Sequence, residues 1–236
     1  MSSRNSIAEV QELARTARGL ASVIDLTNLR PEATPAQIEK LCVEAREYLF
    51  GAVMVNACYV ELAASRLKGT DVKIGAVVGF PLGATLTSVK TYETEEVLKL
   101  GAQEIDMVIN IGALKSGNRG LVRSEIQKLA EISHYRGAIL KVILETGLLS
   151  DDEKRLACEI SEAAGADFVK TSTGFLGGVA TIADVALMRR VVSIGVKASG
   201  GIRTLSDARA MLQAGATRLG VSAGVAIIQE LQNEGA

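Results

Sequence analysis

The sequence contains little of what metal centres and disulfide-bonded folds require, with three cysteines and one histidine among 236 residues. Cys42, Cys58 and Cys158 are odd in number, widely spaced and without a CxxC motif. This pattern disfavours a disulfide framework or a zinc site, and we expect buried free thiols in a reducing cytoplasm. The single histidine, His134, lies at a predicted helix end, where we expect a surface or capping role. A histidine-ligated metal site or a Ser-His-Asp triad therefore has almost no support.

The chain also lacks an excess of charge of either sign and any long hydrophobic run. Its formal net charge is -1 and charged residues make up 22% of it, so no strong field favours nucleic acid or an anionic membrane. Hydrophobic residues make up 48%, in runs well short of the ~20 residues of a membrane span. Residues 1–20 lack a signal-peptide core and predict an amphipathic helix. We therefore expect a cytoplasmic protein with no nucleic-acid or membrane partner.

Eight apolar runs of strand length alternate with segments of helical periodicity, such as Pro35–Leu49, Val89–Leu100 and Leu205–Ala214. The predicted strands are Ser22–Leu26, Ala52–Asn56, Lys73–Gly79, Glu104–Asn110, Ala138–Glu145, Asp167–Thr171, Gly195–Ala198 and Arg218–Val221. This alternation indicates a parallel sheet with crossover helices. Eight units in a chain near the roughly 250 residues typical of the fold favour a TIM (β/α)8 barrel over an open doubly wound sheet. We expect residues 1–236 to form a single barrel domain with an extra N-terminal helix.

Ionisable residues interrupt several of these predicted strands. They are Asp25, Asp106, Lys141, Glu145, Lys170 and Lys197. Any one of them could be an edge or solvated residue, but buried strands of a parallel barrel should otherwise be apolar. Catalytic side chains in this fold come from the C-terminal ends of the strands. Together these residues predict a polar site inside the mouth of the barrel.

Lys170 is the strongest catalytic candidate, because it ends an apolar run and is followed at once by small hydroxyl and glycine residues. Burying an unpaired ammonium is costly, whereas an amine in an apolar pocket can lose its proton and attack a carbonyl. Lys197 lies on the neighbouring predicted strand. An ammonium ~5 Å away, at an effective dielectric constant near 20, contributes roughly 3 kcal/mol against protonation, about two pKa units. Asp106 beside Lys197 would keep Lys197 charged and leave Lys170 neutral, and Asp106 could also move protons.

These assignments give a simple expectation for the resting charges. With Lys170 neutral, the carboxylates of Asp25 and Asp106 balance the ammonium groups of Lys141 and Lys197. The sequence thus predicts an uncharged nucleophile beside two ion pairs.

Glycine-rich turns after the last two predicted strands indicate a phosphate site. Ser199–Gly201 follows the seventh strand and Gly220–Gly224 follows the eighth. Loops at these two positions, with a helix N-terminus, form the recurrent phosphate site of this architecture. Thr171 and Gly174 add donors after the sixth strand. No GxGxxG opens a Rossmann helix and no GxxxxGK[ST] is present, so nucleotide binding lacks its motifs.

Six motifs follow one another along the chain in a specific order. They are Ile24–Thr27, Gly79–Gly83 with Lys90 and Glu93 beyond it, Glu104–Asn110, Leu140–Thr146, Phe168–Phe175 and Val196–Arg203. Together they resemble the deoxyribose-phosphate aldolase family, and the resemblance covers nearly the whole chain after the N-terminal helix. It implies a class I aldolase of TIM-barrel fold. Such an enzyme reversibly cleaves 2-deoxy-D-ribose 5-phosphate into D-glyceraldehyde 3-phosphate and acetaldehyde, without a metal or other cofactor.

The resemblance also assigns roles by motif position. It implies that Lys170 is the Schiff-base nucleophile, Lys197 a proton donor that depresses the pKa of Lys170, and Asp106 the proton relay. The expected substrate-binding residues are Asp25, Thr27, Lys141, Thr171, Gly174, Gly200, Gly201, Gly220 and Ser222. The expected partners are a small phosphorylated sugar and acetaldehyde, and a homo-oligomer, dimer or tetramer, is the default state.

Four features depart from the family pattern. Leu26 stands where the family often has histidine, Met54 where many members have cysteine, and Ala223 where a second serine is common after Ser222. No aromatic residue follows Phe175, whereas some relatives carry a C-terminal tyrosine that assists proton transfer, so solvent or Asp106 would have to serve. These departures bear on rate and substrate tolerance more than on reaction type.

Two alternative functions stay open. One is another lysine-dependent phosphosugar barrel of transaldolase type, against which the two-lysine arrangement argues. The other is a non-catalytic barrel that binds a phosphorylated metabolite, which would leave two inward lysines and an aspartate without a chemical role.

Overall fold

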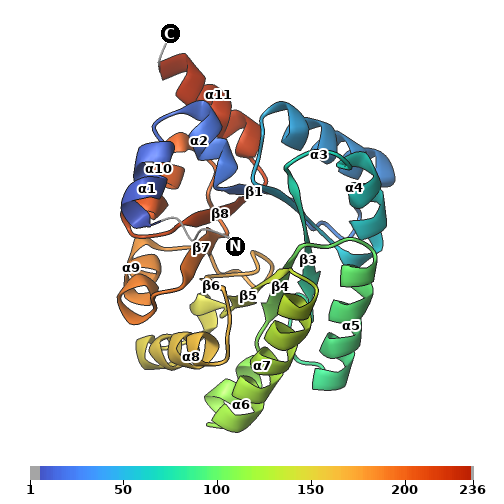
Figure 1. Ribbon diagram of the computed structural model, residues 1–236. Helices are drawn as coiled ribbons and strands as arrows, with labels where there is room; N and C mark the ends of the chain where they lie inside the picture. The colour runs from blue at the N-terminus through green and yellow to red at the C-terminus, as the bar shows by residue number, and fades with distance from the viewer. Residues whose placement is uncertain (1–5, 235–236) are drawn as a thin grey trace.

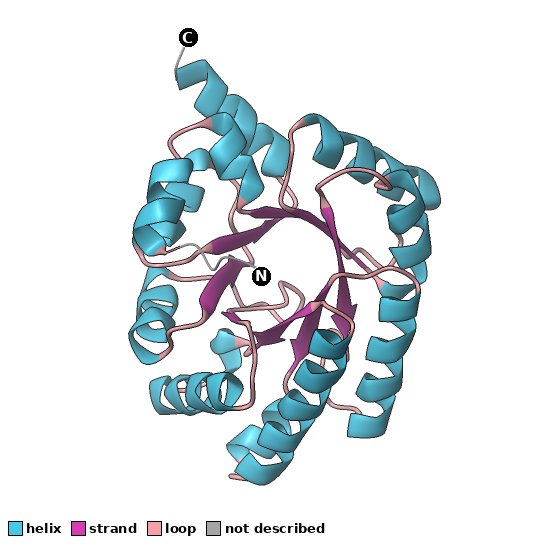
Figure 2. Ribbon diagram, in the orientation of Figure 1, coloured by secondary structure: helices cyan, strands magenta, loops and turns pink. Residues whose placement is uncertain are grey.

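The computed structural model describes residues 6–234, which form a closed barrel of eight parallel strands inside a ring of helices (Figures 1 and 2). Each strand pairs in parallel with the next in sequence, and β8 pairs with β1. The strands are β1 (Ile24–Asn28), β2 (Ala52–Val55), β3 (Lys73–Val78), β4 (Glu104–Val108), β5 (Ile139–Ile143), β6 (Phe168–Lys170), β7 (Gly195–Ser199) and β8 (Arg218–Val221). The TIM-barrel prediction is thus confirmed.

At least one helix follows each strand, two more precede β1, and together the helices cover the outside of the barrel. They are α1 (Ile7–Leu13), α2 (Ala17–Ser22), α3 (Pro35–Glu47), α4 (Val60–Arg66), α5 (Thr87–Lys99), α6 (Ile111–Lys115), α7 (Arg119–Tyr135), α8 (Asp151–Ala163), α9 (Ile182–Val191), α10 (Leu205–Gln213) and α11 (Gly224–Glu234), with 3-10 turns η1 (Ala57–Tyr59) and η2 (Thr146–Leu148). None of these helices is long and apolar enough to cross a bilayer.

The N-terminal region forms two short helices, α1 and α2, where the sequence predicts one over residues 1–20. The first five residues of that prediction lie outside the described part of the chain. Thr16 interrupts the helix, because its backbone is extended and its hydroxyl accepts a hydrogen bond from Gly19 N at 3.1 Å as the N-cap of α2. Ser22 therefore ends α2, and the first strand begins at Ile24 and not at Ser22.

Most remaining strand boundaries differ from the predicted ones by one or two residues at the ends of the strands. Two of the excluded residues have other structural roles. Asn110 caps α6 by accepting a hydrogen bond from Ala113 N at 3.0 Å. Glu145 follows β5 in the left-handed backbone region, with φ 58°, and does not belong to the strand.

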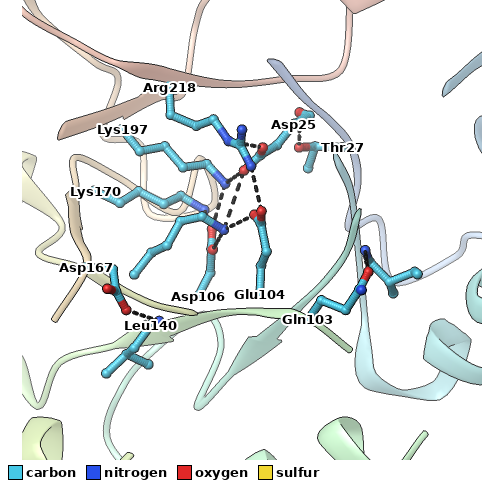
Figure 3. Close-up of polar contacts among 12 residues, drawn as sticks. Asp25, Thr27, Gln103, Glu104, Asp106, Leu140, Asp167, Lys170, Lys197 and Arg218 are labelled. Carbon is cyan, nitrogen blue, oxygen red and sulfur yellow. Dashed lines mark hydrogen bonds and ion pairs between the residues drawn. The ribbon is translucent and has the colours of Figure 1, made fainter. Parts of the chain in front are cut away.

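The two faces of each strand carry different residue types. On β4, Ile105 and Met107 belong to the apolar core beneath the helices, whereas Glu104 and Asp106 point into the barrel (Figure 3). Successive side chains of a strand point to opposite faces, so this alternation fixes which residues meet inside the barrel. The interior of the barrel is therefore charged although it is buried.

The cysteines and the histidine lie away from this interior. Cys42 and Cys158 are buried, and burial raises the pKa of the Cys42 thiol to about 11 and that of Cys158 to about 12. Cys58 is exposed, so the expectation of three buried thiols is wrong for that residue. His134, in the last turn of α7, is exposed, and its Nε2 lies 2.7 Å from Asp167 Oδ2.

Candidate active site

Seven charged side chains from six strands meet inside the barrel (Figure 3). They are Asp25 on β1, Glu104 and Asp106 on β4, Lys141 on β5, Lys170 on β6, Lys197 on β7 and Arg218 on β8. The strand register sets Lys170 beside Lys197 and Lys197 beside Arg218. The cluster is thus a product of barrel closure, since its members are spread over almost the whole chain.

Asp106 is the centre of this cluster. Its Oδ2 accepts hydrogen bonds from Lys170 Nζ at 2.8 Å and from Lys197 Nζ at 2.8 Å. Its Oδ1 accepts one from Lys141 Nζ at 2.9 Å. Burial by itself would raise the pKa of Asp106, but the positive charges of Lys141, Lys170 and Lys197 outweigh it and hold the pKa well below its usual range. Asp106 is therefore a carboxylate in contact with three amines.

Asp25 is the second carboxylate of the interior. It accepts a hydrogen bond from Lys197 Nζ, and its Oδ1 lies 2.6 Å from Arg218 Nε. Lys141 Nζ is 3.7 Å from its Oδ2. Burial would raise the pKa of Asp25, but Arg218, Lys197 and Lys141, in that order, lower it below its ordinary value. These three cations therefore keep the Asp25 carboxyl group ionised.

Glu104 and Arg218 complete the cluster, and neither was among the site residues predicted from the sequence. Arg218 Nη2 donates to Glu104 Oε1 at 2.6 Å, and Glu104 Oε2 lies 2.6 Å from Lys141 Nζ. Both residues begin their strands, at the end remote from where catalytic groups of a barrel are expected. The two-residue period of a strand was the available signal, because it places Glu104 on the same face as Asp106.

Lys170 differs from the other lysines of the cluster in having a single carboxylate partner, Asp106. Lys197 contacts Asp25 and Asp106. Burial of the Lys170 amine, opposed by Asp106 and assisted by Lys197, lowers its pKa to about 8. Burial is the larger cause of this lowered pKa, and the neighbouring ammonium of Lys197, expected from the sequence as the main cause, is a smaller one. An amine with a pKa near 8 is neutral in roughly one molecule in ten at pH 7, far more than an ordinary lysine.

Lys170 also borders open space. A cavity of about 810 Å³ at the C-terminal ends of the strands is lined by Lys170 and by Phe175. Of the predicted substrate-binding residues, those that line the same cavity are Thr27, Gly174, Gly200, Gly201, Gly220 and Ser222. Gly200 and Gly201 have φ 96° and 78°, which only glycine adopts without strain, so the turn after β7 keeps its backbone open to the cavity.

Three predicted substrate-binding residues do not line this cavity. Asp25 and Lys141 lie below it within the charge cluster. The Thr171 hydroxyl donates to Ser199 O at 2.9 Å and accepts from Ser199 N at 3.0 Å, so it ties the end of β6 to β7. Their role as direct substrate contacts stays a prediction. In this structure Asp25 and Lys141 belong to the charge cluster around Asp106, and Thr171 joins the strand that carries Lys170 to β7.

Glu145, also predicted as part of the polar interior, anchors the loop that follows β6. Its Oε2 accepts hydrogen bonds from Thr173 N at 3.1 Å and from Thr173 Oγ1 at 2.5 Å. The next residues, Gly174 and Phe175, form part of the cavity wall, and the Phe175 ring packs edge-on against Phe80 at a centroid distance of 5.1 Å. Glu145 therefore positions one wall of the cavity without entering it.

The departures from the family pattern occupy different environments. Leu26 is buried in the core, and Met54 is buried against Leu29 and Val77. Ala223 lines the cavity beside Ser222 and brings no hydroxyl to it. The end of the chain at residues 235–236 lies outside the described part. Within residues 6–234, no three histidine, cysteine or acidic side chains are grouped so that they could hold a metal ion.

Comparisons with known proteins agree on one family. Residues 19–230 match the family model described as DeoC/LacD family aldolase. A deoxyribose-phosphate aldolase of Streptococcus gordonii is 58% identical over 212 residues, which cover 89% of this chain and 96% of the relative. One of Halalkalibacterium halodurans is 56% identical over 221 residues, covering 92% and 98%.

The structure of the deoxyribose phosphate aldolase of Aeropyrum pernix, described as a unique tetramer, superposes with a TM-score of 0.89 at 33% identity. The superposition covers 99% of this chain and 100% of that one. An eight-stranded barrel with a buried lysine bordering its C-terminal cavity, and sequence relatives of this identity and coverage, lead to one conclusion. The chain belongs to the DeoC/LacD family of aldolases.

Proposed function

We propose that this chain is a class I deoxyribose-phosphate aldolase. It would cleave 2-deoxy-D-ribose 5-phosphate reversibly into D-glyceraldehyde 3-phosphate and acetaldehyde through a Schiff base on Lys170, with no metal or other cofactor. The observation that carries the proposal is Lys170 itself, which borders the cavity, has one carboxylate partner among residues 6–234 and has an amine with a pKa of about 8. The relatives from S. gordonii and H. halodurans bear the name of this activity.

The turns after β7 and β8 would bind the phosphate. Backbone N–H groups at Gly200, Gly201 and Gly220, the Ser222 hydroxyl and the N-terminus of α11 all lie at the cavity end of the barrel. Backbone donors and a helix N-terminus favour an anion. Phosphate bound there leaves the aldehyde end of the five-carbon chain to extend toward Lys170.

Schiff-base formation would begin with attack of the neutral Lys170 Nζ on the aldehyde carbon. The nitrogen loses a proton and the carbonyl oxygen takes one, which gives a neutral carbinolamine. Its hydroxyl takes a second proton and leaves as water, so that a protonated imine remains. Asp106 Oδ2 touches the amines of both Lys170 and Lys197 at 2.8 Å. Lys197 can therefore supply a proton and Asp106 can relay it.

Carbon–carbon cleavage would follow from the positive charge of the imine. The C3 hydroxyl loses a proton, the electron pair of the C2–C3 bond moves toward the imine nitrogen, and D-glyceraldehyde 3-phosphate leaves. The two-carbon enamine that remains on Lys170 takes a proton at C2, and water hydrolyses the resulting imine to acetaldehyde and free amine. Asp106 or solvent would carry these protons.

Reductive trapping tests this proposal. Incubation with acetaldehyde and borohydride should add a reduced two-carbon group to Lys170, detected by mass spectrometry of the peptide that contains it. Lys170→Leu should give no adduct and no cleavage, because the nucleophile is gone while the phosphate turns remain. A binding protein without catalysis gives no adduct in either form. An active Lys170→Leu variant would remove the assignment.

We also propose that the enzyme is a cytoplasmic homo-oligomer. The tetrameric relative from A. pernix supports the oligomer, and the free cysteines support a reducing compartment. Light scattering that gave the mass of a single chain would contradict the proposed homo-oligomer.

A further inference from the structure

Arg218 is one of the members of the charge cluster to which the proposed reaction gives no task. Together with Glu104 it lines a second cavity, of about 530 Å³, bordered by residues at the N-terminal ends of the strands. Neither residue lines the cavity that Lys170 borders. The cluster thus runs from the cavity that Lys170 borders to the second cavity, which Arg218 borders.

The charges of the cluster do not cancel when every group is ionised. Lys141, Lys170, Lys197 and Arg218 are four cations, whereas Asp25, Glu104 and Asp106 are three anions. In a buried cluster a surplus charge is costly, so one proton tends to leave. Arginine does not lose its proton in proteins, and the proton must therefore come from a lysine.

The contacts within the cluster decide which lysine loses the proton. Lys141 has three carboxylates within 4 Å, Lys197 has two and Lys170 has one. Lys170 is therefore the cation with the least compensation. Arg218 reduces the negative charge that is available to the lysines, because its guanidinium also contacts Asp25 and Glu104. Without Arg218, these two carboxylates would compensate lysines alone.

We propose that Arg218 is a positioning residue for the reaction, whose permanent charge at the far end of the barrel keeps the Lys170 amine uncharged. The proposal rests on the function proposed for Lys170. The charged groups that face Lys170 are Asp106, Lys197 and, through Asp106, Lys141. Those that face Arg218 or share its cavity are Asp25, Glu104, Lys73, Asp71 and Arg189.

The sign of the effect follows from the charge count. Without the guanidinium, three lysines face three carboxylates, and the cluster is neutral only when Lys170 is protonated. The pKa of Lys170 should then rise. A unit charge about 10 Å away, at an effective dielectric constant near 20, changes a pKa by about one unit. Removing the charge of Glu104 instead should lower the pKa of Lys170.

The test is the pH dependence of acetaldehyde trapping by borohydride, measured as the rate of adduct formation on Lys170. Arg218→Met should move the midpoint of this profile up by about one pH unit, and Glu104→Gln should move it down. Arg218→Lys keeps the charge and should retain the wild-type midpoint. The double variant Glu104→Gln/Arg218→Met removes one charge of each sign and should return the midpoint toward the wild type.

The four variants separate an electrostatic role from a structural one. If Arg218 only supported the fold, the rate of Arg218→Met would fall at all pH values with an unmoved midpoint, which would overturn the proposal. If Arg218→Met does not fold, Glu104→Gln serves as the test in its place. An unmoved midpoint in Glu104→Gln then overturns the proposal. Absence of an adduct on Lys170 in the wild-type chain would refute the proposed function itself, whereas a normal wild-type adduct with unmoved variant midpoints refutes only the role of Arg218.

Discussion

Replacement of Lys197 by leucine tests how the barrel interior controls the nucleophile. Lys170 Nζ and Lys197 Nζ donate to the same oxygen, Asp106 Oδ2, each at 2.8 Å, so the two nitrogen atoms are separated by at most twice that distance. At ~5 Å and an effective dielectric constant near 20, loss of one ammonium favours protonation of the other by roughly 3 kcal/mol, or about two pKa units. The burial of Lys170 is unchanged by the substitution.

The expected result is a displaced pH profile. The pKa of Lys170 should rise from about 8 to about 10, because Asp106 keeps its negative charge while one of its cations is gone. At pH 7 the fraction of neutral amine, and with it the rate of imine formation, should fall about 100-fold. The loss should be recovered as the pH approaches ~10, where the amine is again deprotonated.

The assay is the rate of borohydride trapping with acetaldehyde between neutral and alkaline pH, for the wild type and Lys197→Leu. Lys128→Leu is a matched control, because Lys128 is exposed on α7, lines neither cavity and has no contact with Asp106. Its profile should equal that of the wild type. A Lys197→Leu profile that is low at every pH, with the wild-type midpoint, would refute the electrostatic coupling and leave Lys197 as a proton donor only.

Two further substitutions test the remaining parts of the site. Lys170→Met should raise the free energy of unfolding by up to about 3 kcal/mol below pH 8, because the pKa of the amine is about 8 in the folded chain and near 10.5 in the unfolded chain. The unfolded chain binds the proton more tightly, so the free energy of unfolding of the wild type rises with pH between these two values. The extra stability of Lys170→Met should therefore vanish above pH 10.5. Denaturant titrations that show the same extra stability at higher pH would contradict this reasoning. Thr171→Val should lower the free energy of unfolding by about 1–3 kcal/mol, since two hydrogen bonds with Ser199 are lost, while KM for 2-deoxyribose 5-phosphate stays unchanged. A raised KM with unchanged stability would instead make Thr171 a substrate contact.

The sequence by itself determined the fold class and the chemical type of the site. Short apolar runs of strand length, each followed by a segment of helical periodicity, suffice to predict eight parallel units, because run length and helical period are local properties of the chain. An isolated lysine at the end of such a run, Lys170, was identifiable for the same reason. The break at Thr16 was missed, since a capping hydroxyl can equally lie on the surface of one longer helix.

Only the tertiary structure decided which charges pair and which hydroxyls are free. Lys197 and Asp25 are separated by 172 residues and touch because the barrel closes between β8 and β1. The same closure brings Arg218 to Glu104, 114 residues away, and turns the predicted two ion pairs into a cluster of seven charges. Coulombic energies depend on distance and burial, and neither is a property of sequence separation. The sequence could therefore name a nucleophile, but the contacts that keep it uncharged exist only in the folded barrel.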